Sequence, residues 1–378
     1  MTTRNKCHKK IALAGITVIC LLALAPAITC AADVGLDAKQ REKLQIDSQL
    51  PLSRGQYDKA ISGLVSSGHS DHPSSWDSLG SPWVGDQVER RNNRIQKFDA
   101  AGHFVSLWGT KGSGKGRFDD PTGIAVDSAG NVYVCDRLND RVQKFSSSGR
   151  FLAQIRSTGA DQFASFSSFG IAVDSKDNLY IAGGHWLVKA SPKGKALRKW
   201  RMEFPKQGIA TSVVEGVAVD AKGMIYVLDR IGAKVLRLDK NGNLVSFWGK
   251  KGSGSGQFDY PVGIAVSPDG TIYVADSQLR RVQGFDSSGR LLVHWTVDYQ
   301  PSAIAVDKSG FCYLADVNSV RKYGKSGELI ARVGNPLVEK KYKKNGNWVV
   351  DVDWKAKGSF CSVHGVAVDK SGCVYVSD

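Results

Sequence analysis

From residue 90 onward, hydrophobic and polar positions alternate in short runs that are separated by turn residues. The segment 123–152 reads GIAVDSAGNVYVCDRLNDRVQKFSSSGRFL, and its four apolar runs are rich in β-branched and aromatic side chains. Such runs, bounded by Gly, Ser and Asp, are typical of short β-strands. We therefore expect four strands in this segment, joined by tight turns and one polar loop.

This four-run pattern recurs along the chain. Close copies start at Gly216 and Gly263, weaker copies start at Gly170 and Ala303, and a sixth copy starts at Gly365 and ends after two runs. Successive starts lie 47, 46, 47, 40 and 62 residues apart. Four-stranded antiparallel units at this period predict a β-propeller. Because both faces of a blade are apolar, each blade must pack against a neighbour on either side, so the repeats have to close into a ring.

The two strands missing from the sixth copy are found before the first one. Residues 90–109 read RRNNRIQKFDAAGHFVSLWG, and YVSD at the chain end followed by RRNNRIQKF has the spacing of 133-YVCDRLNDRVQKF-145. We therefore expect an all-β, six-bladed propeller over residues 90–378, in which residues 94–108 complete the C-terminal blade and remove two open sheet edges. A chain truncated at its C-terminus is the competing interpretation.

The segment 109–116, GTKGSGKG, nearly matches the phosphate-binding pattern G-x-x-x-x-G-K-[ST]. Gly116 stands where that pattern needs a hydroxyl, and the second copy of the segment, 249–256, has Ser255 in place of Lys115. Both copies run from an outer strand to the next inner strand, whereas a phosphate-binding loop precedes a helix. We therefore interpret the glycines as part of two inter-blade crossings and not as a nucleotide site.

The repeat unit resembles the NHL repeat through the landmarks G-[IV]-A-V-D, Y-V-x-D and N-x-R-[VI]-x-x-F. In the first copy these are Gly123–Asp127, Tyr133–Asp136 and Asn139–Phe145, and the resemblance extends over about residues 90–378. The second copy departs from it, since Gly183 replaces the aspartate and Leu187 replaces the arginine. The resemblance implies a six-bladed propeller whose relatives mostly bind proteins, RNA or small ligands, and it fixes no function.

Some six-bladed propellers similar to this chain are enzymes. Peptidyl-amidoglycolate lyases hold zinc through histidines at the start of the innermost strands, and gluconolactonase-like proteins hold calcium through carboxylates and an amide. The corresponding residues here are Thr122, Phe169, Glu215, Val262, Ser302 and His364. Catalytic zinc needs three protein ligands, and only Glu215 and His364 qualify, so we expect no metal, no other cofactor and no catalytic residue. A metal-dependent channel enzyme of either kind is the alternative.

Charged residues also repeat, at Asp136, Asp229, Asp276, Asp316 and Asp378 and at Arg94, Arg141, Lys234 and Arg281. A motif that most blades need is architectural, and ion pairs of this kind need no catalytic role. We expect the aspartate at the end of the second strand to bridge its loop by pairing with the cation that follows. A ring of catalytic carboxylates is the less favoured interpretation.

The loops after the second strands should emerge on the same face as the crossings, and we expect this face to bind a partner. The candidate binding residues are Arg90, Arg137, His185, Trp186, Arg230 and Arg280, since Trp and Arg dominate interface energetics. Lysines at 111, 115, 250 and 251 add positive charge in the crossings, and an insertion at 334–361 adds a lysine cluster with two tryptophans. The alternative is a solvated basic surface without a partner.

The N-terminal 32 residues predict export. Four cations precede Ile11–Ala32, a stretch without charge, and the small residues before Asp33 resemble a cleavage site. The same stretch is long enough to tether the chain in a membrane, so a signal peptide and a signal anchor both stay open. Residues 33–89 form a polar lead-in, with a short charged helix expected at 37–47 and a linker at 62–82.

Composition and charge narrow the choice of partner. Of the 378 residues, 42% are hydrophobic and 41 are glycine, which suits a turn-rich β-protein. Loss of the four cations in residues 1–32, which carry no acid, lowers the formal net charge from +15 to +11, and a basic protein favours anionic surfaces. We expect an exported, non-enzymatic monomer that binds a protein or an anionic polymer of the cell envelope, and no nucleic acid. If the N-terminal segment is not a signal, an RNA-binding or ubiquitin-ligase-associated propeller becomes the alternative.

Overall fold

The computed structural model describes residues 92–156, 168–210, 213–316, 318–334, 356–360 and 362–378, apart from the side chains of residues 168, 169 and 210, and the backbone alone of four further short strands. The chain divides into two compact units, Met1–Trp83 and Val84–Asp378. The helix expected at 37–47, the linker at 62–82 and the candidate Arg90 lie outside the described residues. Among the residues that are described, no helix is long and apolar enough to cross a membrane.

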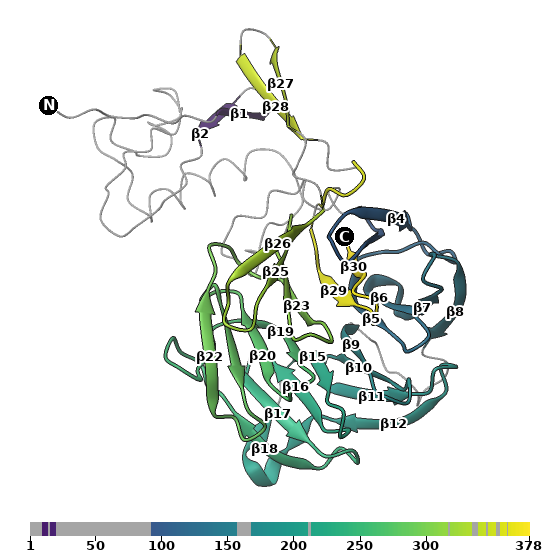
Figure 1. Ribbon diagram of the computed structural model, residues 1–378, viewed down its shortest axis with the longest axis vertical. Coiled ribbons are helices and arrows are strands. Elements are labelled where there is room, and N and C mark those ends of the chain that lie inside the picture. The colour runs from purple at the N-terminus through teal and green to yellow at the C-terminus, as the bar shows by residue number, and fades with distance from the viewer. Residues whose placement is uncertain are drawn as a thin grey trace, which may run out of the picture. The chain divides into compact units, whose positions relative to one another are not determined.

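Six four-stranded antiparallel sheets form the blades of the ring (Figure 1). Blade 1 consists of β5 (Pro121–Val126), β6 (Val132–Asp136), β7 (Arg141–Phe145) and β8 (Phe151–Arg156), from the innermost strand to the outermost. Blade 2 consists of β9 (Ser168–Val173), β10 (Leu179–Gly183), β11 (Trp186–Ala190) and β12 (Ala196–Arg201). Blade 3 consists of β15 (Val214–Val219), β16 (Ile225–Asp229), β17 (Lys234–Leu238) and β18 (Leu244–Trp248).

The remaining blades follow the same order. Blade 4 consists of β19 (Pro261–Val266), β20 (Ile272–Asp276), β21 (Arg281–Phe285) and β22 (Leu291–Thr296). Blade 5 consists of β23 (Ala303–Val306), β24 (Cys312–Ala315), β25 (Val320–Tyr323) and β26 (Leu329–Val333). Blade 6 consists of β29 (Gly365–Val368), β30 (Val374–Ser377), β3 (Ile95–Phe98) and β4 (Phe104–Trp108).

A few short elements complete the described structure. Three pairs of antiparallel strands are β1 (Lys10–Leu13) with β2 (Ile16–Ile19), β13 (Glu203–Phe204) with β14 (Ile209–Ala210), and β27 (Glu339–Lys344) with β28 (Asn347–Val352). Two single-turn 3₁₀ helices are η2 (Arg137–Asn139) and η3 (Pro205–Gln207). The pair β27–β28 falls within the insertion predicted at 334–361.

The second strand of every blade is fully buried, whereas the outermost strands β4 and β18 alternate between half-buried and exposed positions. The boundary between blades 1 and 2 shows the reason. Val142 and Ile155 of blade 1 lie in one apolar cluster with Ile171 and Val188 of blade 2. Each blade therefore removes its apolar faces from water only when a neighbour covers them on both sides.

The ring closes through β3, which joins residues 95–98 to the C-terminal strand β30. Ile95 pairs with Ser377, and the backbones of Arg94 and Asp378 exchange two hydrogen bonds, of 2.8 and 2.9 Å. The inner strands β5, β9, β15, β19, β23 and β29 contact one another in this order, and β29 contacts β5 (Figure 1). The predicted six-bladed propeller and its closure by residues 94–108 are confirmed.

Crowding of the inner strands explains the glycine that opens most repeats. A Cβ atom on Gly365 would overlap the carbonyl oxygen of Thr122 in blade 1, and one on Gly170 would overlap that of Glu215 in blade 3. Neither glycine has a positive φ, so both positions require the absence of a side chain and not a special backbone conformation. The motif glycine therefore lets neighbouring inner strands approach closely around the ring axis.

Candidate binding site on the loop face

Two sets of segments meet at the end of the ring where the inner strands begin. The loops after the second strands include 136–140, 183–185, 229–233 and 276–280, and the described parts of the crossings into inner strands include 109–120, 249–260, 356–360 and 362–364. Backbone hydrogen bonds tie the two sets together, since the N–H of Arg137 donates to Asp120 at 3.2 Å and that of Ser277 donates to Tyr260 at 3.1 Å. We call these segments together the loop face.

In blade 1, an arginine of the third strand holds the crossing that enters the blade. Arg141 is buried and pairs with Asp136, with 2.7 Å between Nε and Oδ2. Its Nη1 and Nη2 donate to the carbonyls of Ser113, Gly114 and Arg117, each at 2.8 Å. Because the backbone carbonyls are turned toward this guanidinium, the crossing is built around a protein cation and not around a phosphate, which would need inward-facing N–H groups.

Blades 4 and 6 repeat the arrangement. Arg281 donates to the carbonyls of Ser253, Gly254 and Gln257 at 2.7, 3.0 and 2.8 Å. Arg94 donates to the carbonyl of Ser359 at 2.8 Å. The bridging role expected for the repeated aspartates is confirmed in four blades by the ion pairs Asp136–Arg141, Asp276–Arg281, Asp316–Arg321 and Asp378–Arg94. In blade 3, the Asp229 carboxylate instead accepts a hydrogen bond from the N–H of Gly232 at 3.0 Å.

In each of these three blades a glutamine also binds the crossing, and our sequence interpretation missed it. We call the arginine and the glutamine together the clamp of the crossing. In blade 1, Gln143 Nε2 donates to the carbonyl of Arg117 at 2.7 Å, and its Oε1 accepts from the N–H of Gly116 at 2.9 Å. Gln283 and Gln96 make the equivalent pairs of hydrogen bonds in blades 4 and 6. The signal was present as the triplet R-[VI]-Q, which occurs at the same offset in these three repeats and in none of the others.

A β-bulge places Glu215 at the inner end of the loop face. Val214 pairs with Asp229 and Gly216 with Leu228, so Glu215 is the extra residue of β15. Bulges commonly re-aim a side chain next to a functional site. Val262 is the extra residue at the same place in blade 4. Two of the positions that we had placed just before the inner strands, Glu215 and Val262, are therefore the extra residues of β-bulges.

The carboxyl group of Glu215 is largely buried and interacts with Arg230 of its own blade and with the charge of Arg137 in blade 1. Its side chain is 11% exposed, and Oε1 lies 2.9 Å from Nε of Arg230. The guanidinium of Arg230 lies over the ring of Tyr260, 4.6 Å from its centre, and donates to its hydroxyl. Burial raises the pKa of Glu215 to about 7, although the charges of Arg230 and Arg137 both lower it. Arg137, in blade 1, is itself paired with the buried Asp120.

These five side chains, from blades 1, 3 and 4, form what we call the axial cluster: Asp120, Arg137, Glu215, Arg230 and Tyr260. Of them, Tyr260 and Asp120 were missed in the sequence. The signal that could have found them is the alignment of the two crossings, which places Tyr260 in the second copy opposite Asp120 in the first. The two crossings are otherwise alike, so a carboxylate in one and a phenol in the other indicate that this position has a different role in each crossing.

The two weak metal candidates do not come together in a ligand set. Glu215 pairs with Arg230, and His364, in blade 6, has its Nδ1 2.8 Å from the carbonyl oxygen of Ser362. Among the residues that the structure describes, no group of three or more His, Cys, Asp or Glu side chains is arranged to hold a metal ion.

The other predicted binding residues differ in their surroundings. Arg137 and Arg230 are half-buried in the axial cluster, whereas His185 and Arg280 are exposed on the loop face. We expected Trp186 in the loop after the second strand, but that loop has only two residues, 184 and 185. Trp186 is the first residue of β11, and the amino group of Lys199 lies 4.1 Å from the centre of its ring.

The architecture and the repeats define a class of protein. Six four-stranded sheets closed in a ring make a six-bladed β-propeller. The family model for the NHL repeat matches residues 118–145 and 258–285, which span the crossing and first three strands of blades 1 and 4. The protein is an NHL-repeat β-propeller.

Several solved structures are similar to the chain. A streptogramin B lyase is 15% identical, with 68% of this chain and 90% of that chain covered and a TM-score of 0.47. A gluconolactonase from Xanthomonas campestris is 17% identical, with 68% and 84% covered and a TM-score of 0.49. A virginiamycin B lyase from Staphylococcus aureus is 12% identical, with 75% and 98% covered and a TM-score of 0.46. No curated protein is significantly similar to the chain.

Proposed function

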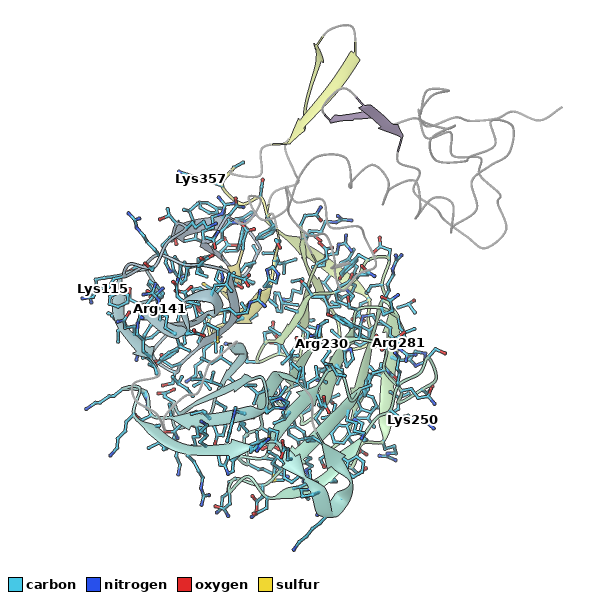
Figure 2. The ribbon with its side chains drawn as sticks, turned by 180° about the vertical axis from the view of Figure 1, so that it is seen from behind. Lys115, Arg141, Arg230, Lys250, Arg281 and Lys357 are labelled. Carbon is cyan, nitrogen blue, oxygen red and sulfur yellow. The ribbon has the colours of Figure 1, made fainter. Side chains whose placement is uncertain are left out.

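We propose that this protein is an exported, non-enzymatic scaffold that binds an anionic partner, either a protein or a polymer of the cell envelope, through its loop face. The observation that carries the proposal is a set of exposed lysines on the two clamped crossings, at positions 111, 115, 250 and 251. Lys115 and Lys250 project from opposite sides of the ring in Figure 2, and Arg230 lies between them. Positive charge is thus spread over a wide surface.

Rigid support makes these lysines suited to binding. Arg141 and Arg281 hold the crossings through three backbone carbonyls each. Because the backbone is already fixed, binding of a partner would have to order only the lysine side chains. Binding that orders fewer groups loses less conformational entropy. A broad, fixed positive surface also raises the association rate with an anionic partner.

Apolar side chains stand among these charges. Leu138 and Ile231, at the tips of the loops in blades 1 and 3, are 60% and 59% exposed. Apolar side chains that become buried against a partner add affinity that salt does not screen. A protein or polymer with both acidic and apolar groups therefore fits the loop face better than a purely ionic chain. Export is proposed on the pattern of residues 1–32.

The experiment compares the wild type with a variant in which Lys111, Lys115, Lys250 and Lys251 are all replaced by Gln. We expect at least tenfold weaker binding to immobilised polyglutamate at 0.1 M salt, and loss of the partners that the wild type captures from an envelope extract. The matched control replaces the exposed Lys193, Lys195, Lys222 and Lys240 of the strand-connecting turns by Gln. Equal loss in both variants, or none in the first, would contradict a loop-face site.

A further inference from the structure

The axial cluster holds an arginine, Arg230, that contacts both a carboxylate and an aromatic ring. Arg230 Nε contacts Glu215 at 2.9 Å, its Nη1 donates to the hydroxyl of Tyr260, and its plane is set by the aromatic ring beneath it. A guanidinium held in this way presents a planar fork that matches the two oxygens of a carboxylate. In the structure, Oε1 of Glu215 lies 2.9 Å from Nε at one end of that fork, as an ion pair without the geometry of a hydrogen bond.

The charges of the cluster balance while Glu215 is ionised. Asp120 pairs with Arg137, and Glu215 pairs with Arg230. The neighbouring inner strands β9 and β19 carry no charged residue. Asp229, at the end of the adjacent strand β16, accepts the hydrogen bond from Gly232 in its own loop. A proton on Glu215 therefore leaves the cluster with one positive charge, which suits a single anionic group.

The geometry points to a binding site for one carboxylate group of a ligand, in which Arg230 receives the ligand and Arg137 adds its positive charge. The ligand carboxylate replaces the carboxylate of Glu215 on the fork of Arg230. Glu215 then takes up a proton and donates it in a hydrogen bond to the incoming oxygen. Above neutral pH, one proton from the solvent forms an O–H bond on Glu215 for each ligand bound, and no other covalent bond forms or breaks.

Glu215 can take up a proton near neutral pH at a small cost in free energy. Burial already raises the pKa of its carboxyl group to about 7, so half of the molecules carry the proton at that pH. The protonated form is the one that leaves Arg230 without its internal partner, and the observed affinity scales with its population. This population falls from about nine-tenths at pH 6 to about one-tenth at pH 8, so affinity falls about tenfold over this range.

The test uses benzoate as the probe and its uncharged isostere benzamide as the ligand control. Isothermal titration of the full chain at pH 6 and pH 8 should show benzoate binding about tenfold more weakly at pH 8, with benzamide not bound at either pH. Titration in two buffers with different ionisation heats should count about one proton taken up per benzoate at pH 8. Equal affinity for benzoate and benzamide, or affinity that does not depend on pH, would overturn the proposal.

Two variants separate the roles of the residues. Arg230→Gln should weaken benzoate binding at least tenfold at both pH values, whereas Arg150→Gln, at an exposed arginine of the turn between β7 and β8, should leave it unchanged. Glu215→Gln mimics the protonated carboxyl, so it should bind benzoate equally at pH 6 and pH 8. Thermal melts show whether each variant is folded. If Glu215→Gln is folded and keeps the pH dependence of the wild type, the assignment is wrong.

A second experiment, with peptides, distinguishes two sources of the carboxylate, polypeptide C-termini and small organic acids. A tripeptide with an acetylated N-terminus is offered with a free or an amidated C-terminus. Binding of the free form alone assigns the site to polypeptide termini, and binding of benzoate without either peptide assigns it to small organic acids. The four-lysine variant described above should bind benzoate like the wild type, so failure of the loop-face proposal and failure of this site are separate results.

Discussion

At the scale of single residues, close packing decides which side chains the inner strands accept. Gly365 meets the backbone of blade 1 and Gly170 meets that of blade 3, where a methyl group has no room. Protein interiors tolerate overpacking poorly because neither strand can move without displacing the next blade. The glycine landmark of the repeat is therefore a packing requirement between blades.

We predict that Gly365→Ala lowers the free energy of unfolding by about 1–3 kcal/mol, because its methyl group overlaps the carbonyl of Thr122. Chemical denaturation measures the change. The control is Gly114→Ala, where the nearest atom lies 3.6 Å from the added Cβ and φ is not positive, and we expect a change within about 0.5 kcal/mol. Equal stability of the two variants would disprove the packing argument.

Glu215 makes stability depend on pH. Its pKa is raised in the folded protein from an ordinary 4.5 to about 7, so the folded state binds the extra proton between these values. The stabilising contribution is complete below pH 4.5 and is lost as the pH rises through 7.

We predict that wild-type stability falls by about 2 kcal/mol more than that of Glu215→Gln between pH 5 and pH 8. Denaturant unfolding of both proteins at the two pH values gives this difference. Burial also raises the pKa of Asp276 to about 6. Its titration changes the stability of both proteins equally, so it cancels in the difference between them. A parallel pH dependence in the two proteins would show that Glu215 does not titrate in this range.

At the scale of elements, the clamps explain why a glycine-rich crossing keeps a fixed course. Arg141 and Gln143 project from β7 and bond to the carbonyls and one N–H of the crossing into the same blade. The position and length of the crossing could be predicted from the spacing of the repeats. The partners of its backbone groups could not, because they lie more than twenty residues away.

We predict that Gln143→Leu removes two hydrogen bonds of the crossing and lowers the free energy of unfolding by about 1–3 kcal/mol. Amide hydrogen exchange should become faster in residues 109–118. The equivalent crossing at 249–258, held by Arg281 and Gln283, serves as the control within the same molecule and should keep its exchange rates. Faster exchange in both crossings would indicate a general loss of stability instead of a local one.

At the scale of the whole molecule, one ion pair joins the two ends of the ring. The buried carboxyl of Asp378 accepts hydrogen bonds from Asn92, Arg94 and Gln96, of 3.0, 3.1 and 3.1 Å. These side chains precede or belong to β3, and the strand they hold completes blade 6. Loss of this carboxyl would remove the ion pair that it forms with the buried guanidinium of Arg94.

We predict that Asp378→Ala lowers the free energy of unfolding by about 3–5 kcal/mol, because it breaks a buried ion pair and removes two further hydrogen bonds to the same carboxyl. Hydrogen exchange should also become faster in β3 and β30, where the ring closes. Asp140→Asn, at an exposed loop position whose left-handed φ of 48° suits asparagine, is the neutral control. Wild-type stability in Asp378→Ala would mean that closure does not depend on this ion pair.

The sequence by itself determined the strands, the number of blades and the closure of the ring. These follow from a repeated apolar pattern, and a blade with two apolar faces leaves few arrangements open. It also placed Glu215, Arg137 and Arg230 near the start of inner strands or the end of second strands. Only the tertiary structure decided that a bulge turns Glu215 toward Arg230, that Tyr260 lies beneath this guanidinium, and that Arg137 from blade 1 acts on the same carboxyl. Contacts between different blades depend on how the sheets are placed relative to one another. The pattern within one repeat predicts the strands of its own blade and not that placement.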